Sequence, residues 1–373
     1  MAIEVFCLDR GAFRLQVIQM DILVIGAGPT GLTAATALTS RGLKCRIVER
    51  KDSPSELSRA VGIMPATIDA LRTLDAADPF LEEAMPLRKI HILRDERTLA
   101  YIDNSGNDFR DRVPLGLPQN RTEGILRDIL AERGVEVEYG ISVTNITTTP
   151  DRADVNFSDS SSGSFDWVVA ADGIQSATRQ QLKIRYPGTD LPNKWSIADV
   201  DLKGDFDPEE ITLDLYGGEG EFTLILPIER RRARIASSTE DALATLRLPM
   251  KIANIRRTAA FKISIRQAET YRKHRVLLAG DAAHCHSPVG GKGMNLGMAD
   301  AIVAATAIAT ESVDSYSTSR YEAAESVVRK TELARKLISS SNPLAKSALW
   351  LSAHCIASVP PVHRAFMRQW TAV

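Results

Sequence analysis

The chain has 373 residues, of which 44% are hydrophobic and 25% charged, and its formal net charge is −1 at pH 7. That composition is typical of a globular protein with two hydrophobic cores or one large core. A nearly neutral chain lacks the broad basic surface that nucleic acids or acidic membranes attract, so a small-molecule partner is favoured. The chain has four cysteines, Cys7, Cys45, Cys285 and Cys355. They form no CxxC pair, which indicates reduced thiols rather than a disulfide framework or a zinc site.

Residues 1–19 carry no export signal, because Glu4, Asp9 and Arg10 interrupt any apolar stretch before it reaches signal-peptide length. They match no pattern that we recognise, and we interpret them as a loosely attached extension, with Met20 as a candidate natural start. These features predict a cytoplasmic protein.

Residues 20–49 predict a strand, a glycine turn, a helix and a second strand. In the turn, Gly26 permits the tight bend, Gly28 lets the backbone approach a pyrophosphate, and Gly31 lets the helix pack on the strand. The helix begins at Pro29 and offers unpaired N–H groups to phosphates. Glu49, at the end of the second strand, stands close to the interval expected for an acid that binds a ribose hydroxyl. This pattern predicts a dinucleotide site, with Arg50 as a further contact.

The middle of the chain is rich in strands. Residues 151–166 predict a strand and a Ser/Gly turn, the apolar strand WVVAAD follows, and alternating strands run from Trp195 to Ser238. An arginine cluster at 229–236 fits either a solvated turn or a contact to a nucleotide phosphate.

A second strand-to-helix corner occupies residues 277–301. Asp281 ends the apolar strand, and Gly290, Gly291 and Gly293 precede an alanine-rich helix, whose N–H groups could face another part of an elongated cofactor. Two such corners suggest one long dinucleotide, although the glycine turn alone does not separate NAD from FAD. His284 and His286 could also be metal ligands, but nothing nearby supplies the further ligands, so no metal is predicted.

After Gly291 the chain is helical almost to its end. It contains no run of about 18 uncharged apolar residues, so no integral membrane segment is expected. The most apolar stretch, 344–359, includes Lys346 and His354 and is expected to be a packed helix; the alternative is a membrane-surface or partner-binding helix.

The second corner resembles the FAD motif of the class A flavin-dependent aromatic monooxygenases, the p-hydroxybenzoate hydroxylase type. The family pattern GDAAH, a proline, and a GG-x-G-M-N helix start are matched by Gly280, Asp281, Ala282, Ala283, His284, Pro288, Gly290, Gly291, Gly293, Met294 and Asn295. A third family motif, which serves FAD and the nicotinamide cofactor, is matched in 171–179 by Asp172, Gly173, Ser176 and Arg179. Arg59 and Gln119 fall where the family has an Arg and a Gln near the flavin. Lys292 departs from the family, which usually has Gln there.

The resemblance, over residues 20 to about 340, implies an α/β fold: a Rossmann-like βαβ FAD-binding domain with an inserted mixed β-sheet substrate domain and C-terminal helices. We expect the FAD-binding domain to comprise 20–86, 114–186 and 272–325, and the sheet domain 87–113 and 187–271. Residues 326–373 would form the C-terminal helices. The substrate pocket would then lie between the two domains, with some of four residues lining it: Trp195, Tyr216, Phe222 and Leu224.

The family's activity implies that NADPH or NADH reduces noncovalent FAD, that oxygen gives a flavin C4a-hydroperoxide, and that a small aromatic, phenolic or polyketide-like substrate is hydroxylated. In this resemblance Asp281 holds FAD near its ribityl chain, Gly291 to Asn295 face the flavin N1 to C2 edge, Arg59 helps to hold the flavin, and Pro288 shapes its reactive face. No catalytic acid or base is identified. The protein would be a monomer or homodimer.

Two other functions fit the same scaffold: an FAD-dependent reductase or saturase, and a non-enzymatic flavin-binding redox sensor if Lys292 disables reduction. A halogenase is disfavoured because the sequence has no WxWxIP segment.

Overall fold

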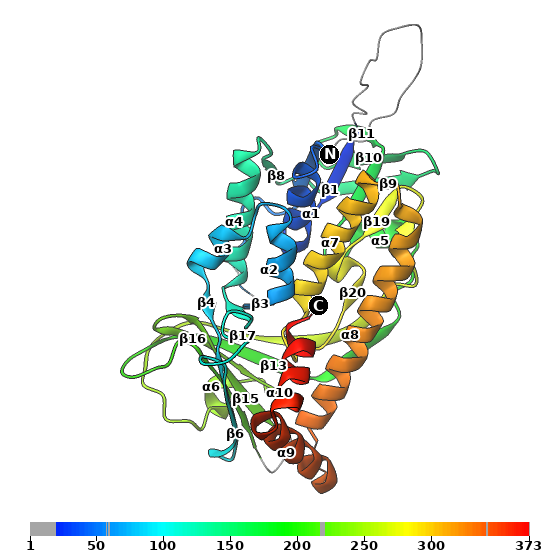
Figure 1. Cartoon of the computed structure of the whole chain (residues 1–373). Coiled ribbons are helices and arrows are strands. Elements are labelled where there is room, and N and C mark those ends of the chain that lie inside the picture. Colours follow the sequence, from blue (N-terminus) through cyan, green and yellow to red (C-terminus); the bar gives the residue numbers. More distant parts are fainter. Residues whose placement is uncertain (1–19, 57, 59, 217–220, 341, 373) are drawn as a thin grey trace, which may run out of the picture.

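A computed structural model describes residues 20–56, 58, 60–216, 221–340 and 342–372. The extension 1–19 and Arg59 lie outside the described residues. Figure 1 shows an elongated molecule: a smaller sheet with helices occupies one end, a larger sheet the other, and the last helices run along one side of both.

The smaller sheet has six strands, and β1 (Ile22–Ile25) lies inside it. All four β1 residues are buried, as expected for a strand covered on both faces. The strand order is β18 (Arg272–Lys273), β19 (Val276–Leu278), β12 (Trp167–Ala170), β1, β2 (Cys45–Glu49) and β8 (Val137–Tyr139). Only β18 is antiparallel to its neighbour, so this is the expected βαβ arrangement.

Two helices pack closely against this sheet and each other, α1 (Pro29–Thr39) and α7 (Gly293–Ala309). Their contact depends on glycine, because a Cβ added at Gly280 or Gly297 would lie 2.5 or 2.4 Å from the Thr30 hydroxyl. Thr30 is therefore held between the start of α1 and the body of α7. Among the surrounding elements are α2 (Pro65–Arg72), α3 (Asp78–Glu83), α4 (Gln119–Glu132), α5 (Ala177–Gln181) and the short turns η1 (Gly280–Ala282) and η2 (Val313–Ser315).

Two small antiparallel sheets complete this end of the molecule. One is β11 (Ser162–Phe165), β10 (Ala153–Phe157) and β9 (Val143–Thr148); the other is β3 (Gly62–Ile63), β7 (Leu115–Gly116) and β4 (Met85–Pro86). The strands expected in residues 151–170 are therefore confirmed.

The larger sheet has eight strands and is mixed, because β14 and β5 run parallel while the other pairs are antiparallel. Its order is β20 (His284–Cys285), β17 (Ile252–Gln267), β13 (Gly188–Leu202), β16 (Arg232–Ser237), β15 (Phe222–Glu229), β14 (Glu210–Leu215), β5 (Lys89–Arg94) and β6 (Arg97–Asp103). β20 comes from the GDAAH stretch, so the sheet joins the first half of the molecule beside that motif.

The two faces of the larger sheet pack against different partners. On one face Ala198, Val200, Ile225 and Ile235 pack with residues around the short helix α6 (Ala242–Thr245). On the other face Trp195, Leu215, Phe222 and Ile263 pack together. Val289, from the loop that contains Gly290 and Gly291, packs against them, as do Ile338 and Leu349 from the last helices. We call the second face the inner face.

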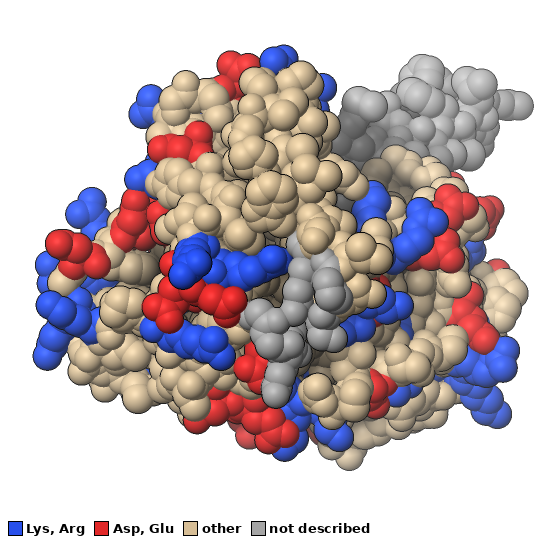
Figure 2. Space-filling view, turned by 90° about the horizontal axis from the view of Figure 1, so that it is seen from below, with Lys and Arg blue, Asp and Glu red and all other residues tan. Residues whose placement is uncertain are grey.

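Three helices end the described chain: α8 (Tyr316–Ile338), α9 (Pro343–Ser358) and α10 (Pro360–Thr371). The stretch 344–359 does form a helix and contributes Leu349 to the inner face, yet Leu344, Trp350 and Leu351 are exposed. Among the described helices, none is long and apolar enough to cross a membrane. Figure 2, a view from below, shows acidic and basic side chains interspersed over that face.

Candidate active site

The first glycine turn combines two structural glycines with one that faces open space. Gly26 has φ +102°, and a Cβ there would lie 2.4 Å from the Ala171 carbonyl oxygen. A Cβ at Gly31 would lie 1.8 Å from the Gly26 oxygen, so α1 packs on the turn only with glycine at this position. A Cβ at Gly28, by contrast, meets nothing within 4 Å. The turn therefore leaves free the space that a ligand needs to approach its backbone.

Glu49 lies beside this turn. Its carboxylate accepts the Ala27 N–H at 2.8 Å and the Lys51 N–H at 3.1 Å. The structure thus brings the acid to the glycine turn, where a ribose hydroxyl could reach it. Arg50, the next residue, is exposed.

The starts of α1 and α7 are both open to an anion. The residues before them, Gly28 and Lys292, make no side-chain capping bond. The first N–H groups of a helix lack intrahelical partners and carry the positive end of the helix dipole. Because Thr30 fixes α1 against α7, one cofactor could reach both of these helix ends.

Asn295, in the first turn of α7, is already engaged by protein. Its amide nitrogen donates to the carbonyls of Gly62 (2.9 Å) and Gly291 (3.0 Å), and its oxygen accepts from the Met64 N–H and the Thr67 hydroxyl, both at 2.8 Å. Its side chain therefore shapes the corner, and only its backbone, with that of Gly293 and Met294, is placed to meet a ligand. Gly291 has φ +64°, a conformation that favours glycine.

The motif in residues 171–179, called the DG motif after Asp172 and Gly173, contains a buried polar atom without a hydrogen-bond partner in the described residues. One Asp172 oxygen accepts the Thr178 N–H at 3.1 Å, while the other, also buried, has no hydrogen-bond partner in the described part of the chain. Gly173, with φ +82°, has no atom within 4 Å of an added Cβ. A buried carboxylate oxygen is costly without a donor, so this spot suits a ligand hydroxyl or N–H.

Arg179 ties the DG loop to the GDAAH turn. Its guanidinium donates to the carbonyls of Ala282 and Ile174, both at 2.9 Å, and stacks over the Tyr186 ring at 3.8 Å. The Tyr186 hydroxyl donates to the Asp281 carbonyl at 3.0 Å. Asp281 itself is exposed beside this network, as is Pro288 in the next loop.

The first histidine of the H-x-H pair belongs to a buried network. Asp300 is fully buried and accepts from the Gly280 N–H (3.0 Å), His284 Nε2 (2.5 Å) and Arg320 Nε (2.6 Å). Burial opposes the charge of Asp300, but His284 and Arg320 outweigh it and lower the pKa of the carboxyl. His284 thus fixes the strand end that carries Asp281. No group of side chains able to hold a metal ion occurs among the described residues.

Sequence reasoning missed a second buried ion pair, between Asp199 and Arg234 on the larger sheet. Both guanidinium-to-carboxylate bonds are 2.7 Å, and Arg234 also donates to the Ser58 carbonyl at 2.9 Å. Arg234 belongs to the arginine cluster 229–236, but it is neither solvated nor free for a phosphate. Gln119 holds the same segment, accepting the Ala60 N–H at 3.1 Å. The two residues flanking Arg59 are therefore fixed from both halves of the molecule.

Three of the four candidate pocket residues lie together on the inner face. The Trp195 and Phe222 rings meet edge to face with centroids 5.0 Å apart, and Leu224 packs in the same cluster. Tyr216 lies on the opposite face, where its hydroxyl bonds Thr223 at 2.8 Å and Arg247 covers its ring at 4.1 Å.

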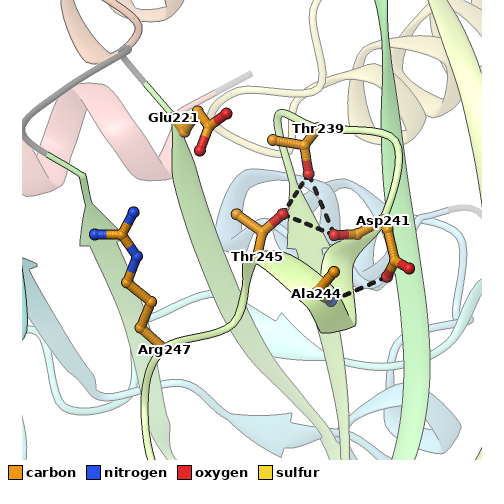
Figure 3. Close-up of a pocket in the computed structure, with 6 residues that line it drawn as sticks. All are labelled: Glu221, Thr239, Asp241, Ala244, Thr245 and Arg247. Atoms are coloured by element: carbon orange, nitrogen blue, oxygen red, sulfur yellow. Dashed lines mark hydrogen bonds between the residues drawn. The ribbon is translucent and has the colours of Figure 1, made fainter.

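That opposite face holds a polar pocket of about 340 Å³ beside α6 (Figure 3). Its lining contains two acids and two threonines but no aromatic side chain, and strand alternation separates it from the inner face. It therefore lies apart from the converging helix starts. Its lining residues are Glu221, Thr239, Asp241, Ala244, Thr245 and Arg247.

Comparison with known proteins matches residues 19–241 and 229–331 to the family described as FAD binding domain. The 6-methylpretetramide 4-monooxygenase of Streptomyces rimosus is 30% identical, covering 92% of this chain and 67% of that protein. The pentachlorophenol 4-monooxygenase of Sphingobium chlorophenolicum is 29% identical, covering 85% of this chain and 64% of that protein. The chain thus spans about two thirds of the length of these relatives.

Solved structures of other proteins share the fold of this chain. The anhydrotetracycline hydroxylase of Streptomyces rimosus superposes with a TM-score of 0.75 at 28% identity, covering 95% of this chain and 76% of that one. The p-nitrophenol 4-monooxygenase of Pseudomonas putida superposes with a TM-score of 0.82 at 22% identity, covering 95% and 97%, which shows the shared fold.

The fold and the two helix starts define a dinucleotide-binding flavoprotein, and the orphaned Asp172 oxygen and the open space at Gly28 fit FAD. The chain belongs to the FAD-binding-domain family, within the class A flavin-dependent aromatic monooxygenases. It is an FAD-dependent oxidoreductase, as the resemblance predicted.

Proposed function

We propose that the chain hydroxylates a phenolic or polyketide-like aromatic ring, using O2 and NADPH or NADH, at the inner face beside the start of α7. The observation that carries this proposal is the apolar cluster of Trp195, Phe222 and Val289, because Val289 belongs to the same loop that leads into α7. The substrates named for the relatives, among them 6-methylpretetramide and pentachlorophenol, are aromatic or polyketide compounds and support the substrate class.

The residues present suit FAD in an extended pose. The Gly28 backbone and the start of α1 would hold the pyrophosphate, Glu49 a ribose hydroxyl, and Asp281 the ribityl region, with Asp172 and Gly173 nearby. Bound FAD supplies the redox and oxygen-transfer chemistry, which side chains lack. We retain the domain division: cofactor binding by 20–86, 114–186 and 272–325, and substrate binding by 87–113 and 187–271.

The chain itself contributes position, electrostatics and exclusion of water. The uncapped start of α7 presents N–H groups and a positive dipole end, which stabilise negative charge on a ligand edge placed there. The inner face presents apolar side chains, and a dry pocket favours transfer to substrate over loss of reducing equivalents to peroxide.

A screen of phenols and tetracyclic aromatics for stimulated NAD(P)H oxidation tests this function. We expect slow oxidation by the protein alone and a rise of at least about tenfold, equivalent to about 1.4 kcal/mol of barrier, with a true substrate. Equal rates with and without every aromatic tested would contradict the proposal and favour the reductase or sensor alternatives.

A further inference from the structure

Lys292, which departs from the family pattern, is bonded to the end of a distant helix. Its ammonium donates to the main-chain carbonyls of Gln369 at 3.2 Å, Trp370 at 2.9 Å and Ala372. An ammonium group has three donors, and the last turn of a helix leaves carbonyls without intrahelical partners. Lys292 therefore caps α10 from the residue that precedes α7.

α10 is anchored at a second place, on the larger sheet. His363 bonds the Asn104 side chain at 3.0 Å and meets the Phe109 ring edge to face, while Met367 is fully buried. Asn104 directly follows β6. In Figure 1 α10 accordingly runs from α9 up to the region of α7 and β20, alongside the larger sheet. It bridges the two halves that enclose the inner face.

The α10 carbonyls meet an ammonium group whose charge is opposed by its other surroundings. No ion pair joins it to a carboxylate within the described ranges, and the charged or titratable groups that influence it are Lys330 on α8 and His286 in the preceding loop. Burial, with help from Lys330, lowers the pKa of Lys292 to about 8. The carbonyls at the end of α10 are the acceptors that meet this ammonium group, at the end of the helix where the dipole is negative.

We propose that Lys292 is a positioning residue that latches α10 across the edge of the inner face, so that α9 and α10 form one wall of the substrate chamber. The proposal rests on the proposed function for the identity of that chamber. α10 begins directly after Val359, and α9 contributes Leu349 to the inner face, so a loosened α10 also loosens this wall.

Hydrogen exchange of the FAD-loaded protein tests the latch without turnover. Lys292→Met keeps the stem of the side chain but removes its donors, and we expect residues 360–372 to exchange at least about tenfold faster while 22–49 stay unchanged. Lys292→Arg, which restores donors, should return most of the protection. Lys330→Met is the matched control, because it removes a neighbouring lysine with no part in the latch, and it should leave α10 protected.

Kinetics with a substrate found in the screen provide the second readout. A loosened wall should raise KM about threefold or more in both Lys292→Met and Asn104→Ala. In Asn104→Ala, which lies away from the cofactor corner, kcat should stay within about twofold, because the chamber and not the chemistry is altered. If Lys292→Met does not fold, Asn104→Ala releases the other end of α10 and should give the same exchange pattern.

Unchanged exchange of 360–372 in Lys292→Met, or equal acceleration in Lys330→Met, would overturn the latch. A wild-type protein that hydroxylates nothing would instead defeat the proposed function, and the exchange result would still decide whether Lys292 holds α10.

Discussion

The starts of α1 and α7 present the same local feature, an uncapped helix end after a strand and a glycine turn, but they are built differently. The α1 corner is shaped mainly by residues 20–49, since Gly26 and Gly31 form the turn and Glu49 closes it, although Ala171 and Gly280 pack closely against it. The α7 corner is assembled from distant segments: Asn295 binds residues 62–64, Lys292 binds α10, and Val289 packs on the larger sheet. The hydrogen bonds that shape the first corner are therefore mostly local, whereas those of the second come from several distant segments.

Substitutions in the α1 corner should separate cofactor binding from folding most sharply. Gly28→Val adds a side chain to open space, so the protein should fold but lose FAD affinity by about 100-fold or more, about 2.7 kcal/mol. Gly31→Ala should instead destabilise the fold, by about 1–3 kcal/mol, because its Cβ would lie 1.8 Å from the Gly26 oxygen. Flavin absorbance and denaturant midpoints measure the two effects. Full FAD occupancy in soluble Gly28→Val would show that the pyrophosphate lies elsewhere.

In the α7 corner, substitution of Asn295 should lower both the stability of the protein and its affinity for FAD. Asn295→Leu removes four hydrogen bonds and leaves buried partners unpaired, so we expect a loss of about 2–4 kcal/mol in the free energy of unfolding, with weaker FAD binding. Urea unfolding and FAD titration check this. Thr122→Val, which removes a buried hydroxyl without a hydrogen-bond partner in the described structure, is a control that should change neither. A fully stable Asn295→Leu protein would mean that the corner does not depend on these bonds.

Acid should destabilise the protein through His286, in the loop before α7. Burial lowers the pKa of His286 from 6.5 to about 4. A lowered folded-state pKa gives stability that is fully present above pH 6.5 and is lost as the pH falls through 4, on the order of 3 kcal/mol. Urea midpoints across this range should fall less in His286→Gln. An identical pH profile for the two proteins would assign the acid sensitivity to other groups.

The smallest effect is expected on the far face of the larger sheet. Tyr216→Phe removes the bond to Thr223 and should cost about 1 kcal/mol of stability, with KM for the aromatic substrate unchanged. Phe222→Ala, on the inner face, is the matched comparison and should raise KM about tenfold or more. Steady-state kinetics show which face of the larger sheet binds the substrate. An equally raised KM in Tyr216→Phe would contradict the assignment of the substrate chamber to the inner face.

These differences explain what could be predicted from the sequence. The βαβ unit and the helical end of the chain were predictable, because glycine spacing and residue periodicity are local signals, whereas the inserted mixed sheet was expected from the family resemblance alone. Strand alternation separates Tyr216, directly after β14, from Leu213 and Leu215, but which of the two faces is the inner one depends on packing partners distant in the chain. Asn295, Arg234 and Lys292 each bond a residue more than 70 positions away in the chain, and a single sequence does not reveal such partners.

The proposed function requires that the chain insert oxygen into an aromatic ring. Turnover under 18O2 of an aromatic that stimulates NAD(P)H oxidation, followed by mass spectrometry of the product, tests it most directly. We expect one 18O atom in the hydroxylated product and none when the label is supplied as water. Consumption of NAD(P)H with an altered but unlabelled product would contradict it and identify a reductase.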